Sequence, residues 1–169
     1  MIEIPLTRGQ VALIDDDCAI LAGFNWRATW HRCVEGFYGV RSATIAPGKR
    51  SSQYLHRAVM ELKLGRLLLR SEFIDHINHA TLDCRSENLR RATRAENNRN
   101  ARLSRRNTSG YKGVSWDPQA RKWVALIMAD RKRRFLGLFE TAEEAGRAYD
   151  AAARELHGEF ALTNSQMKR

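Results

Sequence analysis

Four polar residues near the middle of the 169-residue chain have the types and spacing that hydrolysis of a phosphodiester bond needs. Asp75 and His76 are adjacent, Asn88 follows twelve residues after His76, and Asn97 lies further along. A neutral imidazole can accept a proton from water near neutral pH. A hard cation such as Mg²⁺ prefers oxygen ligands and keeps several waters, so one carboxylate and one amide oxygen suffice to hold it. The set therefore predicts metal-assisted hydrolysis, in which the cation stabilises charge on the phosphate and the leaving oxygen.

The segments around these residues predict two short strands and a helix. Asp75 and His76 end an apolar, strand-like stretch, and a second short strand is expected over Leu89–Ala92. A capping-box pattern at Thr93 then starts a helix that carries Asn97 in its first turns. A strand, a loop, a strand and a helix can therefore bring Asp75, His76 and Asn97 together.

Three runs of sequence carry a family resemblance. They read Asp-His-Ile-Asn from residue 75, Leu-Asp-x-Arg-x-x-Asn-Leu-Arg-x-x-Thr from residue 82, and Glu-Asn-x-x-Asn from residue 96. This wording resembles the HNH, or ββα-metal, nucleases, in particular phage and intron homing endonucleases whose last motif position is asparagine. The resemblance covers residues 54–100, and residues 4–7 with the early strands also look like the N-terminal part of such proteins.

The resemblance implies a role for each site residue. His76 would be the general base, and Asp75 and Asn97 would ligate Mg²⁺ or another divalent cation such as Mn²⁺. Asn88 would brace the loop between the strands through backbone hydrogen bonds, which helps to orient His76. His56 matches a histidine often found upstream in such proteins, and its role stays open.

The chain departs from the family pattern at two places. Family members often read Asn-Gly-Asn where this chain has Asn78-His79-Ala80, so a glycine turn is replaced and strain in the loop is expected. Cys84 stands where asparagine is common. The nearness of His79 to His76 hints at zinc, but the three cysteines lack the spacing of a zinc site or a disulfide framework. We expect Cys18, Cys33 and Cys84 to be reduced, buried thiols.

The charge balance predicts a polyanionic partner. The chain has 29 Lys and Arg against 19 Asp and Glu, a formal net charge of +10, which favours nucleic acid. Residues 85–106 hold eight arginines against two glutamates and predict a basic helix that runs into a linker, with a domain boundary near residue 107. The dominance of arginine favours phosphate contact over a merely solvated face. The arginines expected to contact DNA here are Arg90, Arg91, Arg94, Arg99 and Arg102.

The last third predicts three strands and a helix. The strands are expected over residues 111–116, 122–128 and 133–139. Thr141 and Glu144 form a capping box, and Gly158 is a natural C-terminal stop for the helix that follows. The helix is expected to bury one stripe of residues, namely Ala145, Ala148, Tyr149, Ala152 and Leu156.

Four runs in this part carry a second resemblance. They read Ser-Gly-Tyr-Lys-Gly-Val from residue 109, Arg-Lys-Trp-Val-Ala from residue 121, Phe-Leu-Gly-Leu-Phe from residue 135, and Thr-Ala-Glu-Glu-Ala-x-x-Ala-Tyr-Asp-x-Ala-Ala from residue 141. They resemble the AP-two/ERF (ethylene-response-factor) domain over residues 109–164. Such domains lay a three-stranded sheet in the DNA major groove and pack the helix behind it. The resemblance implies DNA contacts from Lys112, Lys122, Arg133 and Phe135.

Strand alternation sorts the residues of the middle strand between two faces. Trp123, Ala125 and Ile127 should meet the helix, and the alternate residues should face outward. Leu126 and Met128 are outward residues at positions where the family usually has charge, so the target sequence stays open.

These observations together predict an α+β chain with two domains, residues 1–106 and 107–169. The first third is expected to form strands over residues 10–14, 26–30 and 37–43, one or two helical turns over 19–24, and a short helix over 52–64. The expected function is metal-dependent cleavage of double-stranded DNA by a cytoplasmic protein of a bacterial or phage-infected cell. No membrane segment, secretion signal or obligate protein partner is expected. Two alternatives remain, a DNA-binding regulator with an inactive nuclease centre and an RNA-binding protein or intron maturase.

Overall fold

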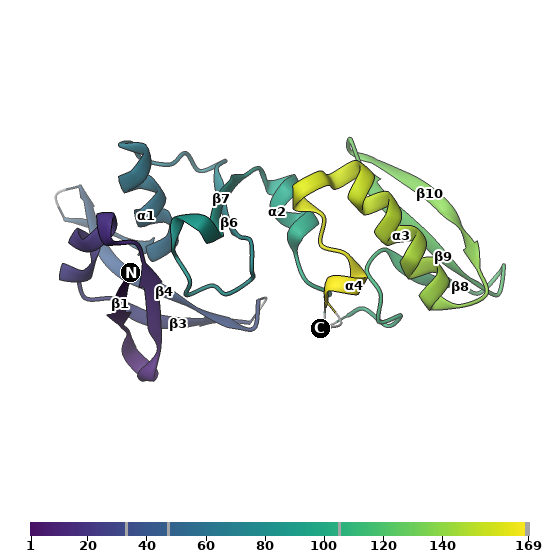
Figure 1. Cartoon of the computed structure of the whole chain (residues 1–169), viewed down its shortest axis with the longest axis horizontal. Helices are drawn as coiled ribbons and strands as arrows, with labels where there is room; N and C mark the ends of the chain where they lie inside the picture. The colour runs from purple at the N-terminus through teal and green to yellow at the C-terminus, as the bar shows by residue number, and fades with distance from the viewer. Residues whose placement is uncertain (33, 47, 105, 168–169) are drawn as a thin grey trace. The chain divides into compact units, whose positions relative to one another are not determined.

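The computed structural model describes residues 1–32, 34–46, 48–104 and 106–167 (Figure 1). The chain divides into two compact units, Met1–Arg94 and Ala95–Arg169, and each unit is described by itself. This division lies earlier in the chain than residue 107, where the functional boundary stays a prediction. Cys33 lies outside the described residues, whereas Cys18 and Cys84 are free and buried as expected.

The first unit opens with two antiparallel sheets and a helix. Strand β1 pairs with β2, and a second sheet has the order β3-β4-β5. The strands are β1 (Ile2–Pro5), β2 (Val11–Ile14), β3 (Arg27–His31), β4 (Gly36–Ala46) and β5 (Lys49–Tyr54). The helices are the 3₁₀ segments η1 (Thr7–Gly9) and η2 (Asp16–Gly23) and the helix α1 (Leu55–Leu64). α1 ends at Gly65, whose φ of 62° is left-handed, as expected for a glycine stop.

Two strands of this unit were not expected. β1 is short, and β5 is a polar strand without apolar alternation, so hydrophobic periodicity gives no signal for it. The helix expected from residue 52 begins at Leu55 instead, because Gln53 and Tyr54 pair with β4 at Arg41 and Val40.

The core of the first unit is built from β1, β2, η2 and α1. Its largest fully buried side chains include Ile4, Ile14, Leu55 and Val59. The thiols of Cys18 and Cys84 pack into the same cluster. This core supports the strands that follow α1.

A second antiparallel pair follows α1 and then leads into a short helix. β6 (Phe73–His76) pairs with β7 (Leu89–Ala92), and His76 lies opposite Leu89. The loop between them contains the 3₁₀ turn η3 (Ser86–Asn88), and α2 (Arg94–Asn100) comes after β7. The expected basic helix over residues 85–106 is therefore wrong in extent, since Leu89–Ala92 bonds to β6 and only Arg94–Asn100 is helical.

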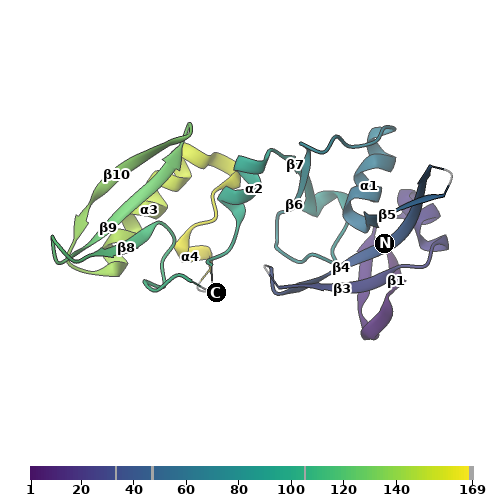
Figure 2. The same ribbon diagram turned by 180° about the vertical axis from the view of Figure 1, so that it is seen from behind.

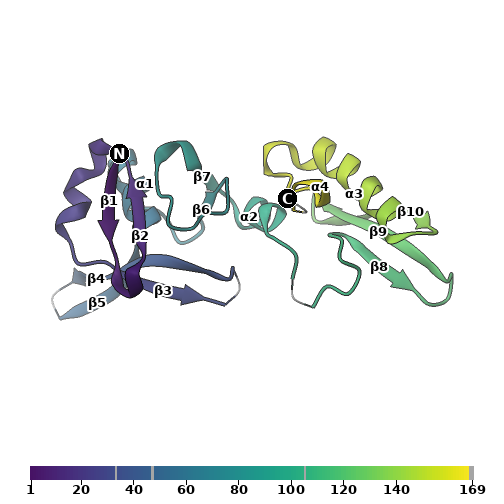
Figure 3. The same ribbon diagram turned by 60° about the horizontal axis from the view of Figure 1, so that its bottom comes forward.

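The second unit is a three-stranded antiparallel sheet covered on one face by a long helix. The strand order is β10-β9-β8, and Figure 2 shows the sheet in front of the helix. The elements are β8 (Val114–Asp117), β9 (Lys122–Ala129), β10 (Lys132–Phe139), α3 (Ala142–His157), η4 (Gly158–Phe160) and α4 (Asn164–Met167). Among the described residues no helix covers the opposite face of this sheet, as Figure 3 shows.

The helix α3 begins as the sequence predicts. The hydroxyl of Thr141 accepts a hydrogen bond from the Glu144 N–H at 3.2 Å, and the Glu144 carboxylate accepts from the Thr141 N–H at 3.2 Å. Ala125 and Ile127 of β9 are buried against α3, as strand alternation predicts, and Trp123 packs partly buried on the same side.

The buried stripe of α3 differs from the expected one. Ala145 and Tyr149 are buried as predicted, whereas Ala148, Ala152 and Leu156 are only partly buried. Their place in the interior is taken by Gly146, Asp150, Ala153 and His157. Asp150 tolerates burial because its carboxylate accepts hydrogen bonds from the Asn164 N–H at 2.7 Å, the Asn164 amide at 2.9 Å and the Ser165 N–H at 3.0 Å.

No helix in the described part of the chain is both long and apolar enough to cross a membrane.

Candidate active site and DNA-binding surface

The last two residues of β6 hold the candidate acid–base and metal-binding groups. Asp75 is 7% exposed and His76 is 5% exposed. Asp75 lies opposite Arg90 on β7, whose Nε and Nη2 lie 2.9 Å and 2.8 Å from the carboxylate Oδ2. This pair fixes the orientation of the carboxylate beside His76.

Asn88 closes the loop that follows His76. Its side-chain oxygen accepts a hydrogen bond from the Asn78 N–H at 2.9 Å, and its amide donates to the Asp83 carbonyl at 2.7 Å. The Asn88 carbonyl accepts from the Ile77 N–H at 2.9 Å. These are backbone hydrogen bonds of the kind that the resemblance implies, and the loop leaves β6 directly after His76.

A second bracing residue in this loop was missed in the sequence. The Asp83 carboxylate accepts from the Asn78 amide at 3.0 Å and from Arg85 Nε and Nη2, each at 2.8 Å. The hydrogen bond from Arg85 is the main cause of a lowered pKa of Asp83. Both residues fall in the Leu-Asp-x-Arg run, which was the available signal, but that run alone does not say which atoms meet.

His79 bears out the expected strain in the loop. Its φ is 61°, in the left-handed region that favours glycine, at the position where the family often has glycine. The turn is held by the Ala80 N–H, which donates to the Asn78 side-chain oxygen at 2.7 Å. The loop therefore adopts the glycine-type conformation with a histidine in it.

Replacing His79 with glycine is expected to stabilise the first unit slightly. The left-handed conformation costs a non-glycine residue about 1–2 kcal/mol, and glycine loses about 0.5–1 kcal/mol more backbone entropy on folding. The net gain should be about 0.5–1 kcal/mol in the free energy of unfolding. Denaturant titration of the full chain measures it. If His79→Gly is less stable, the contacts of the imidazole stabilise the folded state by more than the strained backbone destabilises it.

His76 lies in a cluster of histidine and tyrosine rings. Its ring centre is 5.1 Å from that of His56 on α1 and 5.9 Å from that of Tyr38 on β4. Tyr54 continues the cluster, with its ring 5.5 Å from His56 and its hydroxyl 3.3 Å from Nε2 of His31. The structure thus places His56, whose role the sequence left open, directly beside His76.

Burial keeps the imidazoles of His76 and His56 neutral. It lowers the pKa of His76 to about 4, although Asp75 and Asp83 act in the opposite direction. Burial also lowers the pKa of His56 well below its usual range, and the neighbouring His76 adds to this effect. At neutral pH His76 can therefore accept a proton, which is what a general base requires.

Two of the five arginines that were predicted to bind DNA form ion pairs within the protein. Arg90 is only 14% exposed at its side chain because it binds Asp75. Arg91 is 52% exposed and pairs with Glu72 at 2.9 Å. Arg94 and Arg102 are exposed and Arg99 is half-buried. Contact with DNA stays a prediction for all five.

The open face of the β8–β10 sheet carries most of the other predicted contacts. Arg133 is exposed and Phe135 is 63% exposed, while Lys122 pairs with Glu140 at 2.8 Å. Met128 is 52% exposed on the same face, so the outward surface mixes basic and apolar groups as the sequence predicts.

Lys112 lies differently from the expectation of an outward cation. Its ammonium donates to the carbonyls of Arg99 and Ala101, the latter at 2.8 Å. Burial lowers the pKa of Lys112 to about 8. Lys112 therefore ties the segment after α2 to the start of the sheet, and its contact with DNA stays a prediction.

Comparisons with known proteins match two parts of the chain. Residues 53–99 match the HNH endonuclease family, and residues 109–159 match the AP2 domain. The chain is 36% identical to protein 3.8 of Escherichia phage T7 over 89 residues, which are 53% of this chain and 73% of that protein. The chain belongs to the HNH endonuclease family and carries an AP2 domain.

Plant transcription factors are also similar to part of the chain. An ethylene-responsive transcription factor of Arabidopsis thaliana is 54% identical over 59 residues, 34% of this chain and 23% of its own length. A factor of Medicago truncatula is 50% identical over 60 residues, 34% of this chain and 22% of its own length. The chain therefore spans less than a quarter of the length of these two plant relatives.

The two predicted metal ligands carry oxygen donors. HNH nucleases are typically metal-dependent, and Asp75 and Asn97 offer a carboxylate and an amide oxygen of the kind Mg²⁺ or Mn²⁺ prefers. Asn97 lies half-buried on α2, in the second unit. Within the described ranges no three His, Cys, Asp or Glu side chains gather into one site.

Proposed function

We propose that this protein is a metal-dependent DNA endonuclease of the homing type, which hydrolyses phosphodiester bonds with the residues of β6 and α2. The nuclease domain would comprise residues 1–106 and the DNA-binding domain residues 107–169. The observation that carries the proposal is the position of His76, a buried imidazole at the end of β6 that lies beside the His56 ring and next to the Asp75 carboxylate, which Arg90 holds in place. The phage relative suggests action in the cytoplasm of a bacterial or phage-infected cell.

The residues would divide the chemistry among them. His76 accepts the proton of the attacking water, and Asn88 keeps the following loop closed so that the imidazole holds its orientation. Asp75 and Asn97 would hold the cation. When bound, Mg²⁺ or Mn²⁺ supplies positive charge that stabilises the phosphate and the leaving oxygen.

The AP2 domain would select the DNA. A three-stranded sheet fits the major groove, and its open face presents Lys122, Arg133 and Phe135. Lysine and arginine would neutralise phosphates, whereas Phe135 with the outward Leu126 and Met128 offers apolar contact to thymine methyl groups. The arginines around β7 and α2 would add phosphate contacts closer to the cutting centre.

A second candidate function is a DNA-binding regulator with an inactive nuclease centre. The observation that favours it is the Arg90–Asp75 pair, which engages the Oδ2 atom of the expected metal ligand with two nitrogens. A guanidinium in this position opposes the approach of a divalent cation.

Nicking of supercoiled plasmid separates the two candidates. The endonuclease should convert plasmid to open-circular or linear form with Mg²⁺ or Mn²⁺ and should stop when EDTA is added. Plasmid that is bound but never cut with either cation would establish the regulator instead. Cutting that EDTA does not affect would contradict the ligand set of Asp75 and Asn97.

Alanine at Lys122 or Arg133 is expected to weaken the salt dependence of DNA binding. Each phosphate contact contributes about 0.9 to the slope of log K against log salt, so each variant should lower the slope by about that amount. Fluorescence anisotropy with duplex DNA at several salt concentrations measures the slope. Arg147→Ala, which removes the same type of charge from an exposed site on α3, is the matched control and should leave it unchanged. If all three variants keep the slope of the unsubstituted chain, the sheet does not contact DNA phosphates through Lys122 or Arg133.

A further inference from the structure

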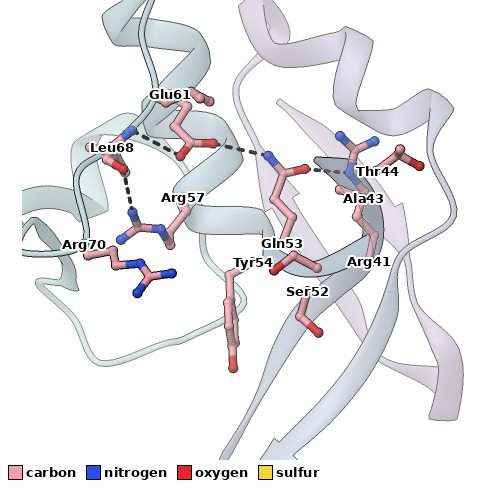
Figure 4. A pocket seen from close by; sticks show the side chains of 12 residues that line it. Arg41, Ala43, Thr44, Ser52, Gln53, Tyr54, Arg57, Glu61, Leu68 and Arg70 are labelled. Carbon is pink, nitrogen blue, oxygen red and sulfur yellow. Dashed lines mark hydrogen bonds between the residues drawn. The ribbon is translucent and has the colours of Figure 1, made fainter. Parts of the chain in front are cut away.

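A cavity lined by arginines opens on the first unit, outside the β6–β7 centre. Its volume is about 570 Å³. Arg41 lines it from β4, Arg57 from α1, and Arg70 from the segment that follows α1 (Figure 4). Glu61 is the one carboxylate that lines it among the described residues. Three guanidinium groups against one carboxylate give the cavity a positive charge.

Arg41 is held in place without an acidic partner. Its guanidinium carbon lies 3.7 Å from the ring centre of Phe24 and 5.2 Å from that of Trp26. Its Nε donates to the side-chain oxygen of Gln53 at 2.7 Å. In the described part of the chain no carboxylate pairs with Arg41, and burial lowers the pKa of its guanidinium. Because the stacking orients the Arg41 guanidinium before any ligand arrives, it favours binding of an anion.

The other charges of the cavity leave its positive character intact. Arg57 donates to the carbonyls of Glu72 at 2.8 Å, Leu69 at 3.3 Å and Leu68 at 3.4 Å, which orient its guanidinium without neutralising it. Both carboxylate oxygens of Glu61 already have partners, since they accept from the Gln53 amide at 3.2 Å and the Leu68 N–H at 3.2 Å. Figure 4 shows this chain of bonds from Leu68 through Glu61 to Gln53 and Arg41.

Arg70 has the most freedom of the three arginines. Its side chain lines the cavity and is exposed, and no described carboxylate pairs with it. Arg41 and Arg57 are held in place and can position a ligand first, and the Arg70 side chain can then move to contact it. It is also the arginine that can be replaced with the least effect on folding.

The distribution of donors indicates a chain of phosphates as the ligand. Arg41, Thr44, Ser51 and Ser52 line the cavity from β4 and β5, whereas Arg57 and Arg70 line it from the α1 side. A single small anion would gather its donors around one point, but a nucleic-acid strand meets donors along its length.

Two ring contacts link the cavity to the candidate active site. Tyr54 lines it, and the Tyr54 ring lies 5.5 Å from that of His56, which in turn lies 5.1 Å from that of His76. We propose that this cavity binds the backbone phosphates of the DNA strand that flank the bond to be cut. The inference rests on the proposed function for the identity of the ligand, but it concerns binding and can be tested without cleavage.

The test is DNA binding by the full chain in EDTA, with fluorescence anisotropy at several salt concentrations. Arg70→Gln should lower the slope of log K against log salt by about 0.9, and Arg41→Gln should do the same if it folds. Arg70→Lys keeps the charge and should keep the slope. The matched control is Arg27→Gln, an exposed arginine on β3 at the other edge of the sheet, which should behave as the unsubstituted chain.

Ethylation of single phosphates then locates the contact. For the unsubstituted chain, ethylation of a few adjacent phosphates should block binding, and Arg70→Gln should lose this effect at one or two of them. An unchanged slope and an unchanged ethylation pattern in Arg70→Gln would overturn the inference. A second result would also overturn it. If inorganic phosphate protects the arginines of the cavity from chemical modification in the absence of DNA, but Arg70→Gln leaves the salt dependence of DNA binding unchanged, the cavity holds only a small anion. Failure of the proposed function is a separate result, namely absence of cleavage with Mg²⁺ by the unsubstituted chain.

Discussion

Replacing His76 with alanine is expected to slow DNA cleavage by a factor of about 10²–10⁴, the usual contribution of a general base. DNA affinity should stay nearly unchanged, because His76 is buried and its proposed role is proton transfer rather than DNA binding. Single-turnover cleavage and anisotropy binding on the same DNA measure the two quantities. Cleavage at the full rate by His76→Ala would remove the imidazole from the reaction.

Two further measurements distinguish a base from a structural residue at this position. Imidazole added to His76→Ala should restore part of the rate, which it would not do if the variant were merely misfolded. An NMR titration of the free protein should place the pKa of His76 near 4, below the ordinary value of about 6.5, because burial opposes the charged form. The neutral base is then present at every pH well above 4 and is lost as the pH falls through that value.

Replacing Gly113 with alanine is expected to cost about 2–5 kcal/mol of the stability of the second unit. Gly113 has a φ of 73°, and an added Cβ would lie 2.0 Å from the Tyr149 ring and 2.6 Å from the Leu126 carbonyl oxygen. The left-handed backbone contributes about 1–2 kcal/mol to the loss and the overlap about 1–3 kcal/mol. DNA binding by the sheet should weaken in parallel as the folded fraction falls.

Gly110 provides the matched control for this substitution. Its φ of 75° is nearly the same, but an added Cβ would meet nothing within 4 Å. Gly110→Ala should therefore cost only the backbone part, about 1–2 kcal/mol. Denaturant unfolding followed by tryptophan fluorescence compares the two. Equal stabilities would show that Tyr149 moves away at little cost and does not fix the start of the sheet against α3.

The sequence was most informative where local patterns decide local structure. The strands β6 and β7, the capping box at Thr141 and the inward side of β9 follow from periodicity and short-range hydrogen bonding, and the structure confirms them. The strain at His79 was also predictable, because a missing glycine in a turn motif leaves its conformation to another residue.

The remaining features depend on contacts between distant residues that no local pattern records. β5 is polar and is defined only by its partner β4. Asp150 is buried because Asn164, fourteen residues later, satisfies its carboxylate. Lys112 turns to main-chain carbonyls near the end of α2. The arginine cavity likewise unites residues from β4, α1 and the following segment, and it could not be read from arginines that are scattered along the chain.

The most direct test of the central claim is to sequence the DNA ends that the full chain produces from a library of duplexes with Mg²⁺, with the His76→Ala chain as the reference. The account predicts ends at discrete positions in the sample with the unsubstituted chain, since the AP2 domain would direct the cutting centre to preferred sites. Equal numbers of ends in the two samples would contradict it, because cleavage would then not depend on the imidazole that the HNH centre requires.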